Sequence, residues 1–282
     1  MSPPGPAPDR LRIATWNLNS LRTRLGGIER FIERARPDVL CLQETKTTDP
    51  PPTATAAFER LGYTAVHVGR GGYNGVAVVA RHPIVDVQNA GDFGDEHLDQ
   101  EPRVIAAVVE TPEPVRVVSV YAPHGRTLDD PHFTYKLAFL DALAGQVEQW
   151  SGDDVRLVVA GDVNVAPTDS DIFHPDAFVG LTHVTPAERE ALQRVLDAGL
   201  VDVDAAAWGP RARHFTWWNY GIGYSRNLGM RIDLIAADHA LAQRLDTTWI
   251  DHVERDTKPS SDHAALVADF ALPDTPIADG GP

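Results

Sequence analysis

The sequence contains a single cysteine, Cys41, so no disulfide can form within the chain. Its place in the apolar run 39–42 predicts a buried, unreactive thiol. No run of about 18 apolar residues occurs, so no transmembrane helix and no membrane partner are expected. Residues 1–9 are rich in proline and lack the apolar core of a secretion signal. Together these absences predict a cytoplasmic protein.

Positive charge is also scarce, because the formal net charge is −15 and only three of the 25 basic residues are lysines. Phosphate binding depends on lysine and arginine, so this composition argues against a general nucleic-acid coat. The basic residues near the polar motifs predict a local basic rim on an acidic protein, although these arginines could equally balance neighbouring acids. They are Arg22, Arg24, Lys46, Arg103, Arg211, Arg213, Arg226, Arg231 and Lys258.

The 282 residues contain no internal repeat and no long linker, so we expect one domain over residues 10–273 with disordered tails at 1–9 and 274–282. Short β-type runs alternate with helical patterns. Strands are expected at 12–16, 38–42, 64–68, 76–80, 103–109, 115–120, 156–160, 231–236 and 264–270, and helices at 21–36, 54–61, 131–150 and 186–198. This pattern predicts a four-layer α/β sandwich: two packed sheets, mainly antiparallel or mixed, flanked by helices.

Two of the expected helices carry further detail. In 131–150, apolar residues recur at spacings of three and four and predict one buried stripe. Its members are Phe133, Leu137, Leu140, Leu143, Val147 and Trp150. The helix at 186–198 should begin with Thr185 as N-cap and Glu188 at the third helical position, and should end before Gly199.

Two short polar runs are the most informative motifs. Gly-Asp-Val-Asn at 161–164 follows an expected strand, and Ser-Asp-His at 261–263 precedes another. Asp162 and Asn164 lie two positions apart, so an extended backbone points both side chains to the same face. A carboxylate and an amide that face the same way are suited to orienting an attacking water molecule.

Further polar residues stand at other strand ends. Asn17 and Asn19 close the first strand, the residues 43–46 close the second, and Tyr121 closes the strand 115–120. Polar groups at strand ends on one edge of a sandwich can gather in one cleft. His174 and His183 follow the run 166–169 and could face the same cleft.

The chemistry that this set suggests is phosphodiester hydrolysis. Glu44 is the candidate anchor for Mg²⁺, which prefers oxygen ligands and retains waters. Asp162 with Asn164 would orient the water. His263 can donate to the phosphoryl oxygens if Asp233 holds its other nitrogen, and Tyr121 could donate to the phosphate or aid the leaving group.

The motifs together resemble one known family. Leu-Gln-Glu-Thr-Lys (42–46), Gly-Asp-Val-Asn (161–164), Arg-Ile-Asp (231–233) and Ser-Asp-His (261–263) resemble, in that order, the exonuclease III family of abasic-site endonucleases within the endonuclease/exonuclease/phosphatase superfamily. Segments 16–22, 73–77, 99–105 and 166–169 are similar to that family as well. The resemblance covers residues 12–270, nearly the whole expected domain.

The resemblance implies a Mg²⁺-dependent nuclease, with Mn²⁺ as an expected substitute, that cuts duplex DNA on the 5′ side of an abasic site and leaves a 3′-hydroxyl. It also implies 3′–5′ exonuclease and 3′-phosphatase activity. The expected partner is therefore double-stranded DNA with abasic sites or blocked 3′ ends. Nothing in the sequence indicates an obligate protein partner, so a monomer is expected.

Matching positions extend the implied site. The implied catalytic residues are Tyr121, Asp162, Asn164, Asp233 and His263, and the implied metal site draws on Asn17, Glu44, Asp162, Asn164, Asp262 and His263. The implied DNA-contacting residues are Arg22, Lys46, Tyr73, Asn74, Arg103, His124, Trp217, Met230, Arg231 and Ile232. Of these, Trp217, Met230 and Ile232 would wall the pocket for the flipped-out sugar, and extrusion requires least energy where no base is present.

Two positions depart from the family pattern. His124 stands where an amide side chain is usual, and Asn219 stands where an acid is usual. An imidazole can still donate to phosphate, but its charge changes near pH ~6.5, so His124 should affect the pH profile of cleavage.

Several alternatives remain open at this point. A phosphoesterase of the same superfamily acting on small or lipid phosphates would keep the acid–histidine core, and a binding module without catalysis is a third possibility. The pair Trp217 and Trp218 could be core or DNA-facing. The sequence also leaves open whether one or two metal ions act, and whether Asp162 removes the proton of the water or only aims it.

Overall fold

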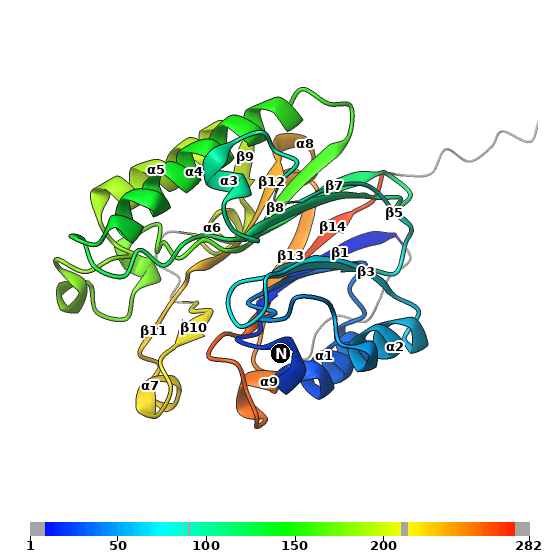
Figure 1. The fold of residues 1–282 in the computed structure, drawn as a ribbon, viewed down its shortest axis with the longest axis horizontal. Coiled ribbons are helices and arrows are strands. Elements are labelled where there is room, and N and C mark those ends of the chain that lie inside the picture. The colour runs from blue at the N-terminus through cyan, green and yellow to red at the C-terminus, as the bar shows by residue number, and fades with distance from the viewer. Residues whose placement is uncertain (1–8, 90, 210–213, 274–282) are drawn as a thin grey trace, which may run out of the picture.

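The computed structural model describes residues 9–89, 91–209 and 214–273, and in it two six-stranded sheets stack face to face with helices on both outer sides (Figure 1). The first sheet has the order β13 (Leu245–Asp251), β14 (Ala265–Ala271), β1 (Arg10–Asn17), β2 (Val39–Gln43), β4 (Val76–Ala80) and β3 (Thr64–Val68). The second has the order β5 (Ile84–Asn89), β6 (Val104–Val109), β7 (Val115–Tyr121), β8 (Arg156–Asp162), β12 (Asp233–Asp238) and β9 (Leu200–Asp202). Both sheets are mixed, so the expected four-layer α/β sandwich is confirmed. The expected tails lie outside the described residues, apart from Asp9.

Helices cover the outer face of each sheet (Figure 1). The first sheet is covered by α1 (Leu21–Ala35) and α2 (Pro52–Arg60), and the second by α3 (Glu96–Asp99), α4 (Pro131–Trp150) and α5 (Pro186–Asp197). Shorter elements are the 3-10 helices η1 (Asp169–Asp171) and η2 (Pro175–Phe178), the helices α6 (Val203–Trp208), α7 (Ile222–Ser225), α8 (His239–Ala242) and α9 (Val253–Asp256), and the two-stranded sheet of β10 (Trp217–Trp218) and β11 (Gly229–Met230). In the part of the chain that the structure describes, no helix is long and apolar enough to cross a bilayer.

Three apolar layers fill the spaces between these four layers of structure. The central strands of the sheets are buried on both faces, which explains why β2 is a nearly continuous apolar run. Cys41 points into the layer between the sheets, whereas Leu40 and Leu42 point toward α1 and α2. The prediction that Cys41 is buried and unreactive is consistent with its full burial, which raises the pKa of the thiol.

The helix α4 corrects one detail of the sequence analysis. Its buried face consists of Lys136, Phe139, Leu140, Leu143, Gln146, Val147 and Trp150, whereas Phe133 and Leu137 are only half-buried. The spacing of apolar residues alone did not predict this buried face, because the face includes a lysine. The ammonium of Lys136 is buried against Glu188 of α5. The start of α5 is as predicted, with the Thr185–Glu188 capping box.

The topology brings several strand ends to one edge of the sandwich. The parallel strands β1 and β2 pair Asn17 with Gln43, and the parallel strands β7 and β8 pair Tyr121 with Asp162. The antiparallel strand β12 begins at Asp233, directly opposite Asp162. Because both sheets present these ends to the same side, one cleft can draw on side chains from both.

Candidate active site

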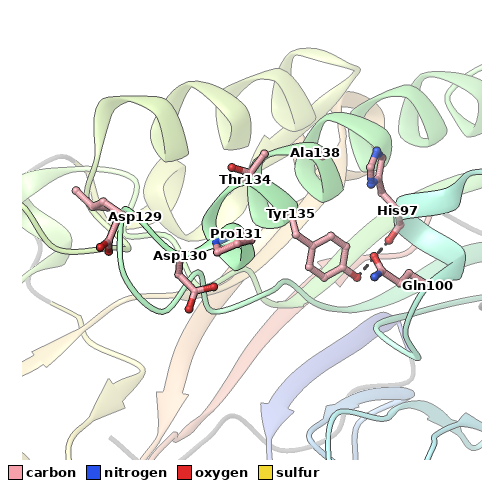
Figure 2. Close-up of a pocket in the computed structure, with 9 residues that line it drawn as sticks. His97, Gln100, Asp129, Asp130, Pro131, Thr134, Tyr135 and Ala138 are labelled. Atoms are coloured by element: carbon pink, nitrogen blue, oxygen red, sulfur yellow. Dashed lines mark hydrogen bonds between the residues drawn. The ribbon is translucent and has the colours of Figure 1, made fainter.

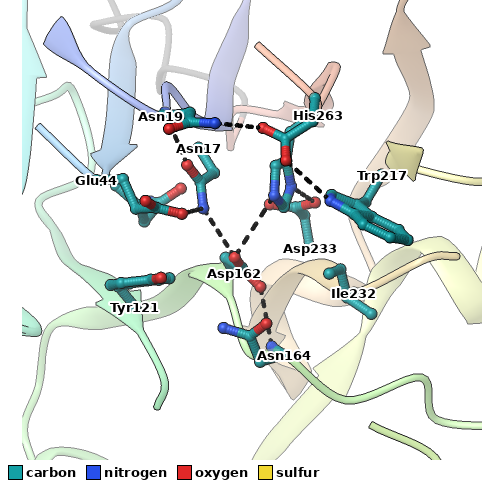
Figure 3. A network of polar contacts seen from close by, with 12 residues as sticks. Asn17, Asn19, Glu44, Tyr121, Asp162, Asn164, Trp217, Ile232, Asp233 and His263 are labelled. Carbon is teal, nitrogen blue, oxygen red and sulfur yellow. Dashed lines mark hydrogen bonds and ion pairs between the residues drawn. The ribbon is translucent and has the colours of Figure 1, made fainter. Parts of the chain in front are cut away.

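Asn17 joins carboxylates that come from the two different sheets. Its Nδ2 donates to Oε1 of Glu44 at 2.9 Å and to Oδ2 of Asp162 at 2.8 Å (Figure 3). Glu44 follows β2 of the first sheet, and Asp162 ends β8 of the second. The Oδ1 of Asn17 accepts from the backbone N–H of Asn19 at 3.0 Å, so both ends of this amide are fixed.

His263 is held by Asp233 and faces Asp162. Its Nδ1 lies 2.7 Å from Oδ2 of Asp233, and its Nε2 lies 3.7 Å from Oδ2 of Asp162. Burial alone would lower the pKa of His263, but the charge of Asp233 and the hydrogen bond to it, followed by the charge of Asp162, raise it to about 10. The imidazole is therefore a cation at neutral pH and can donate through Nε2.

The conformation around Asp162 is set by its own loop. The backbone N–H of Asn164 donates to Oδ1 of Asp162 at 2.9 Å, with Asn164 in the left-handed region at φ 52°. At Gly161 a Cβ atom would lie 1.9 Å from the carbonyl oxygen of Val120, so only glycine fits there. This close approach of β7 and β8 allows Asp162 to reach Asn17.

Asp262 forms the other wall of the site. Its Oδ1 accepts from Nδ2 of Asn19 at 3.0 Å and its Oδ2 accepts from Nε1 of Trp217 at 3.2 Å. Lys46 donates to Oδ1 of Asn19 at 2.6 Å and pairs with Oε2 of Glu44 at 2.8 Å. Lys46 thus balances part of the negative charge at the cleft.

The donor set fits a hard divalent cation. Glu44, Asp162 and Asp262 bring carboxylate oxygens to the cleft, and such ligands are those that Mg²⁺ prefers. Ligand atoms of Asp162, Asp233 and His263 lie within 4.8 Å of one another. Oδ1 of Asp233 is buried without a hydrogen-bond partner in the described part of the chain, so the cluster retains an unsatisfied acceptor.

Tyr121 is held beside the carboxylates as a neutral phenol. Burial, and then the charges of Glu44 and Asp162, raise its pKa well above the ordinary value. The guanidinium of Arg103 stacks on its ring at 5.0 Å. The hydroxyl therefore keeps its hydrogen at neutral pH and can act as a donor.

An apolar wall adjoins the acids. Met230 and Ile232 are buried in one cluster with Ala166 and Ile172, and Trp217 packs against it. Trp218, in contrast, is a core residue that donates from Nε1 to Oδ1 of Asn227 at 3.0 Å. Trp218 is therefore core, whereas Trp217 is half-buried and contacts Asp262.

The predicted DNA-contacting residues differ in exposure. Arg22, Tyr73 and His124 are exposed, while Lys46 and Asn74 are half-buried beside the cleft. Arg103 is mostly buried, pairs with Glu101 and contacts Tyr121.

Arg231 does not reach the surface that would face DNA, and this corrects the sequence analysis. It is buried in ion pairs with Asp171 and Asp202, at 2.6 and 2.8 Å. Of the proposed basic rim, Arg211 and Arg213 lie outside the described residues.

Two residues that were not predicted from the sequence also hold the site. The hydroxyl of Tyr220 lies 3.1 Å from Nδ2 of Asn19 and 3.4 Å from Oδ1 of Asp262. Lys136 donates to the backbone carbonyl of Asn164 at 2.6 Å from inside α4. A lysine within an otherwise apolar helical face was the available signal for Lys136, and nothing in the sequence marked Tyr220.

Comparisons with known proteins agree with this geometry. A model described as the Endonuclease/Exonuclease/phosphatase family matches residues 14–263. Exodeoxyribonuclease III of Haemophilus influenzae is 31% identical over 272 residues, covering 92% of this chain and 100% of that protein. A solved structure of the 3′ phosphatase NExo from Neisseria, bound to a product DNA hairpin, has a TM-score of 0.87 and 36% identity, covering 93% of this chain and 100% of that one. An AP endonuclease from Archaeoglobus fulgidus has a TM-score of 0.84 and 34% identity, covering 92% and 99%.

Proposed function

Because this chain belongs to the endonuclease/exonuclease/phosphatase family, on its exodeoxyribonuclease III branch, we propose that it cuts duplex DNA on the 5′ side of abasic sites and clears blocked 3′ ends. The observation that carries this proposal is the joining of Glu44 and Asp162 through Asn17, with His263 facing Asp162. Similar solved proteins are described as an AP endonuclease and a 3′ phosphatase, which supports both activities.

The residues have distinct tasks in the hydrolysis. A water molecule attacks the phosphorus, the bond from phosphorus to the 3′ oxygen breaks, and that oxygen leaves as a 3′-hydroxyl after taking up a proton. Asp162 aligns the water and accepts its hydrogen. His263, held as a cation by Asp233, donates through Nε2 to a phosphoryl oxygen. The neutral phenol of Tyr121 donates to the phosphate as well. Tyr121 and His263 lie on different sides of Asp162 (Figure 3).

Glu44, Asp162 and Asp262 would hold the metal, with Mg²⁺ as the proposed ion and Mn²⁺ as its substitute. A bound divalent cation supplies charge neutralisation at the phosphate. Asn17 bridges Glu44 and Asp162 by donating to both. The apolar wall of Trp217, Met230 and Ile232 excludes water beside them and suits an extruded sugar that carries no base.

Cleavage of a defined duplex tests the proposal. The substrate carries one abasic analogue, and the control duplex is intact but otherwise identical. We expect Mg²⁺-dependent incision 5′ to the analogue, a product that a DNA polymerase can extend, and no incision in EDTA. Asp162→Asn should lower kcat by about 10²–10⁴-fold because it removes the acceptor for the water's hydrogen.

The same assay separates the alternatives. A small-phosphate or lipid-phosphate hydrolase would leave the abasic duplex intact and turn over a soluble phosphomonoester or diester. A binding module would retain the duplex without cutting it. Either result, obtained with folded and metal-loaded protein, would refute the proposed function.

A further inference from the structure

Asn164 is held from behind by a histidine outside the proposed catalytic set. The Nε2 of His183 lies 3.1 Å from Oδ1 of Asn164. At its other end, the amide of Asn164 donates from Nδ2 to the carbonyl oxygen of Ala122 at 2.9 Å. Because the Ala122 carbonyl can only accept, the group that faces His183 is the amide oxygen, and the hydrogen in this contact belongs to Nε2 of His183.

The backbone places this ring at a conformational cost. His183 has φ 81°, in the left-handed region that glycine adopts freely and that other residues occupy at a cost of about 1–3 kcal/mol. Surrounding bonds hold it there: its N–H donates to Oε1 of Glu188 at 2.8 Å, and its carbonyl accepts from the N–H of Ala166 at 2.8 Å. A strained backbone that carries a buried polar ring to the edge of a catalytic cluster indicates a functional constraint.

The ring of His183 is enclosed beside the cleft. Only 6% of the residue is exposed. The ring also packs edge-to-face against His124, with ring centroids 4.4 Å apart. His183 therefore lies between two cleft residues and contacts both.

We propose that His183 is a positioning residue for the phosphodiester hydrolysis: its Nε2–H fixes Oδ1 of Asn164, so that the second Nδ2 hydrogen of Asn164 is presented to the substrate phosphate. In Figure 3 the amide nitrogen of Asn164 points to the side of the site where Tyr121 lies. Asn164 then acts as a hydrogen-bond donor and not as a ligand through Oδ1. This inference rests on the proposed function.

A pair of substitutions separates the hydrogen bond from the packing. His183→Gln keeps an N–H donor at a similar reach, whereas His183→Met has a similar volume and no donor. We expect His183→Met to lower kcat on the abasic duplex by about 10–100-fold, as for other outer partners of a reacting group. His183→Gln should recover most of that loss, and both should keep the wild-type Kd for the same duplex in EDTA within about twofold. Equal losses in the two variants would refute the positioning role.

A double-mutant cycle identifies the route of the effect. In an Asn164→Ala background, His183→Met should change kcat by less than about twofold, because the residue it acts through is gone. Independent, multiplying losses would overturn the proposal. The wild-type protein is measured in the same assay. If the wild-type protein does not cut the duplex, the proposed function is wrong. If it cuts and the variants behave differently from these expectations, only the positioning role of His183 is wrong.

A third measurement uses the wild-type protein, so its result does not depend on whether a variant folds. Ring ¹⁵N NMR of the wild-type protein should show a hydrogen on Nε2 of His183. A neutral ring with its hydrogen on Nδ1 would contradict the proposal, because Nε2 would then have no hydrogen to give to Asn164.

Discussion

The departure at His124 has a consequence for pH. Partial burial of the ring, and then the positive charges of Lys136 and His132, lower the pKa of His124. At neutral pH the ring is therefore uncharged, and its Nδ1 accepts the backbone N–H of Arg126 at 3.1 Å. Glu44 and Glu188 act in the opposite direction but do not reverse the shift.

His124→Asn should change the pH profile of cleavage more than the maximum rate. Because the pKa lies below 6.5, the wild-type ring gains its charge only in the acid limb, where a cation next to the phosphate strengthens DNA binding. We expect the two proteins to have matching kcat/KM at pH 7.5 to 8.5, and the ratio of variant KM to wild-type KM to rise below pH 6.5. Superimposable profiles from pH 5 to 8.5 would show that His124 does not contact the phosphate.

The site residues that could be predicted from the sequence are those that lie at the ends of strands. The link between Asp162 and Glu44 through Asn17 agrees with the expectation that strand ends share an edge. The spacing argument for Asn164 assumed an extended backbone, whereas this residue follows β8 and lies in the left-handed region at φ 52°. Arg231 could not be placed in this way, because its partners Asp171 and Asp202 come from η1 and β9, and neither element has a sequence pattern long enough to predict.

Among the elements, α4 and α5 are joined by a buried ion pair and by an exposed one. Nζ of Lys136 lies 2.5 Å from Oε1 of Glu188, and both side chains are fully buried. Although burial alone would raise the pKa of Glu188, the charge of Lys136 and three further hydrogen bonds lower it. On the surface of the same two helices, Arg194 of α5 pairs with Asp141 of α4 at 2.6 Å.

Lys136→Met should destabilise the protein by about 3–5 kcal/mol, because the carboxylate of Glu188 is left buried without its cation. The matched control, Arg194→Met, breaks an exposed pair between the same helices and should cost about 0–1 kcal/mol. Urea unfolding followed by tryptophan fluorescence measures both. Adding Glu188→Gln to Lys136→Met should restore part of the stability, since the glutamine amide needs no counter-ion. A Lys136→Met loss as small as that of Arg194→Met would show that the buried pair contributes little.

A strand or helix could be predicted where its segment has a clear pattern of apolar and polar residues. Strands in the middle of the two sheets are buried on both sides, so their continuous apolar runs, such as 115–120 and 156–160, were readable. The strands β5, β9 and β13 lie at sheet edges and were missed. In β5 only the ends approach burial, and in β13 the sequence Leu-Asp-Thr-Thr-Trp-Ile-Asp mixes polar and apolar residues without a clear alternation.

For the molecule as a whole, a net charge of −15 must coexist with DNA binding. The exposed Arg22 stands at the start of α1, on the edge of the sandwich that carries the site, while the exposed Arg60 ends α2 near the opposite edge. After Arg60 the chain enters β3 at Thr64, which pairs with Ala80 of β4. Gln43, at the site end of β2, pairs with Val76 at the other end of β4. Arg60 therefore precedes the end of β3 that lies away from the site.

Arg22→Ala should weaken binding to duplex DNA and reduce the slope of log K against log salt by about one, as expected for loss of one phosphate contact. Arg60→Ala removes a charge of the same type and should leave the slope unchanged. Fluorescence anisotropy in EDTA, over a range of KCl concentrations, keeps the DNA intact during the titration. Parallel changes in the two variants would mean that net charge alone, and not a local basic rim, governs binding.

The order of strands has a consequence for synthesis of the protein. His263 lies two residues before β14, the strand between β1 and β13. Nε1 of Trp16 donates to the carbonyl oxygen of His263 at 3.2 Å. Glu44, Asp162 and Asp233 have all left the ribosome before this last strand can insert beside the first. A growing chain therefore lacks His263 and its contact with Asp233 until β14 has inserted beside β1.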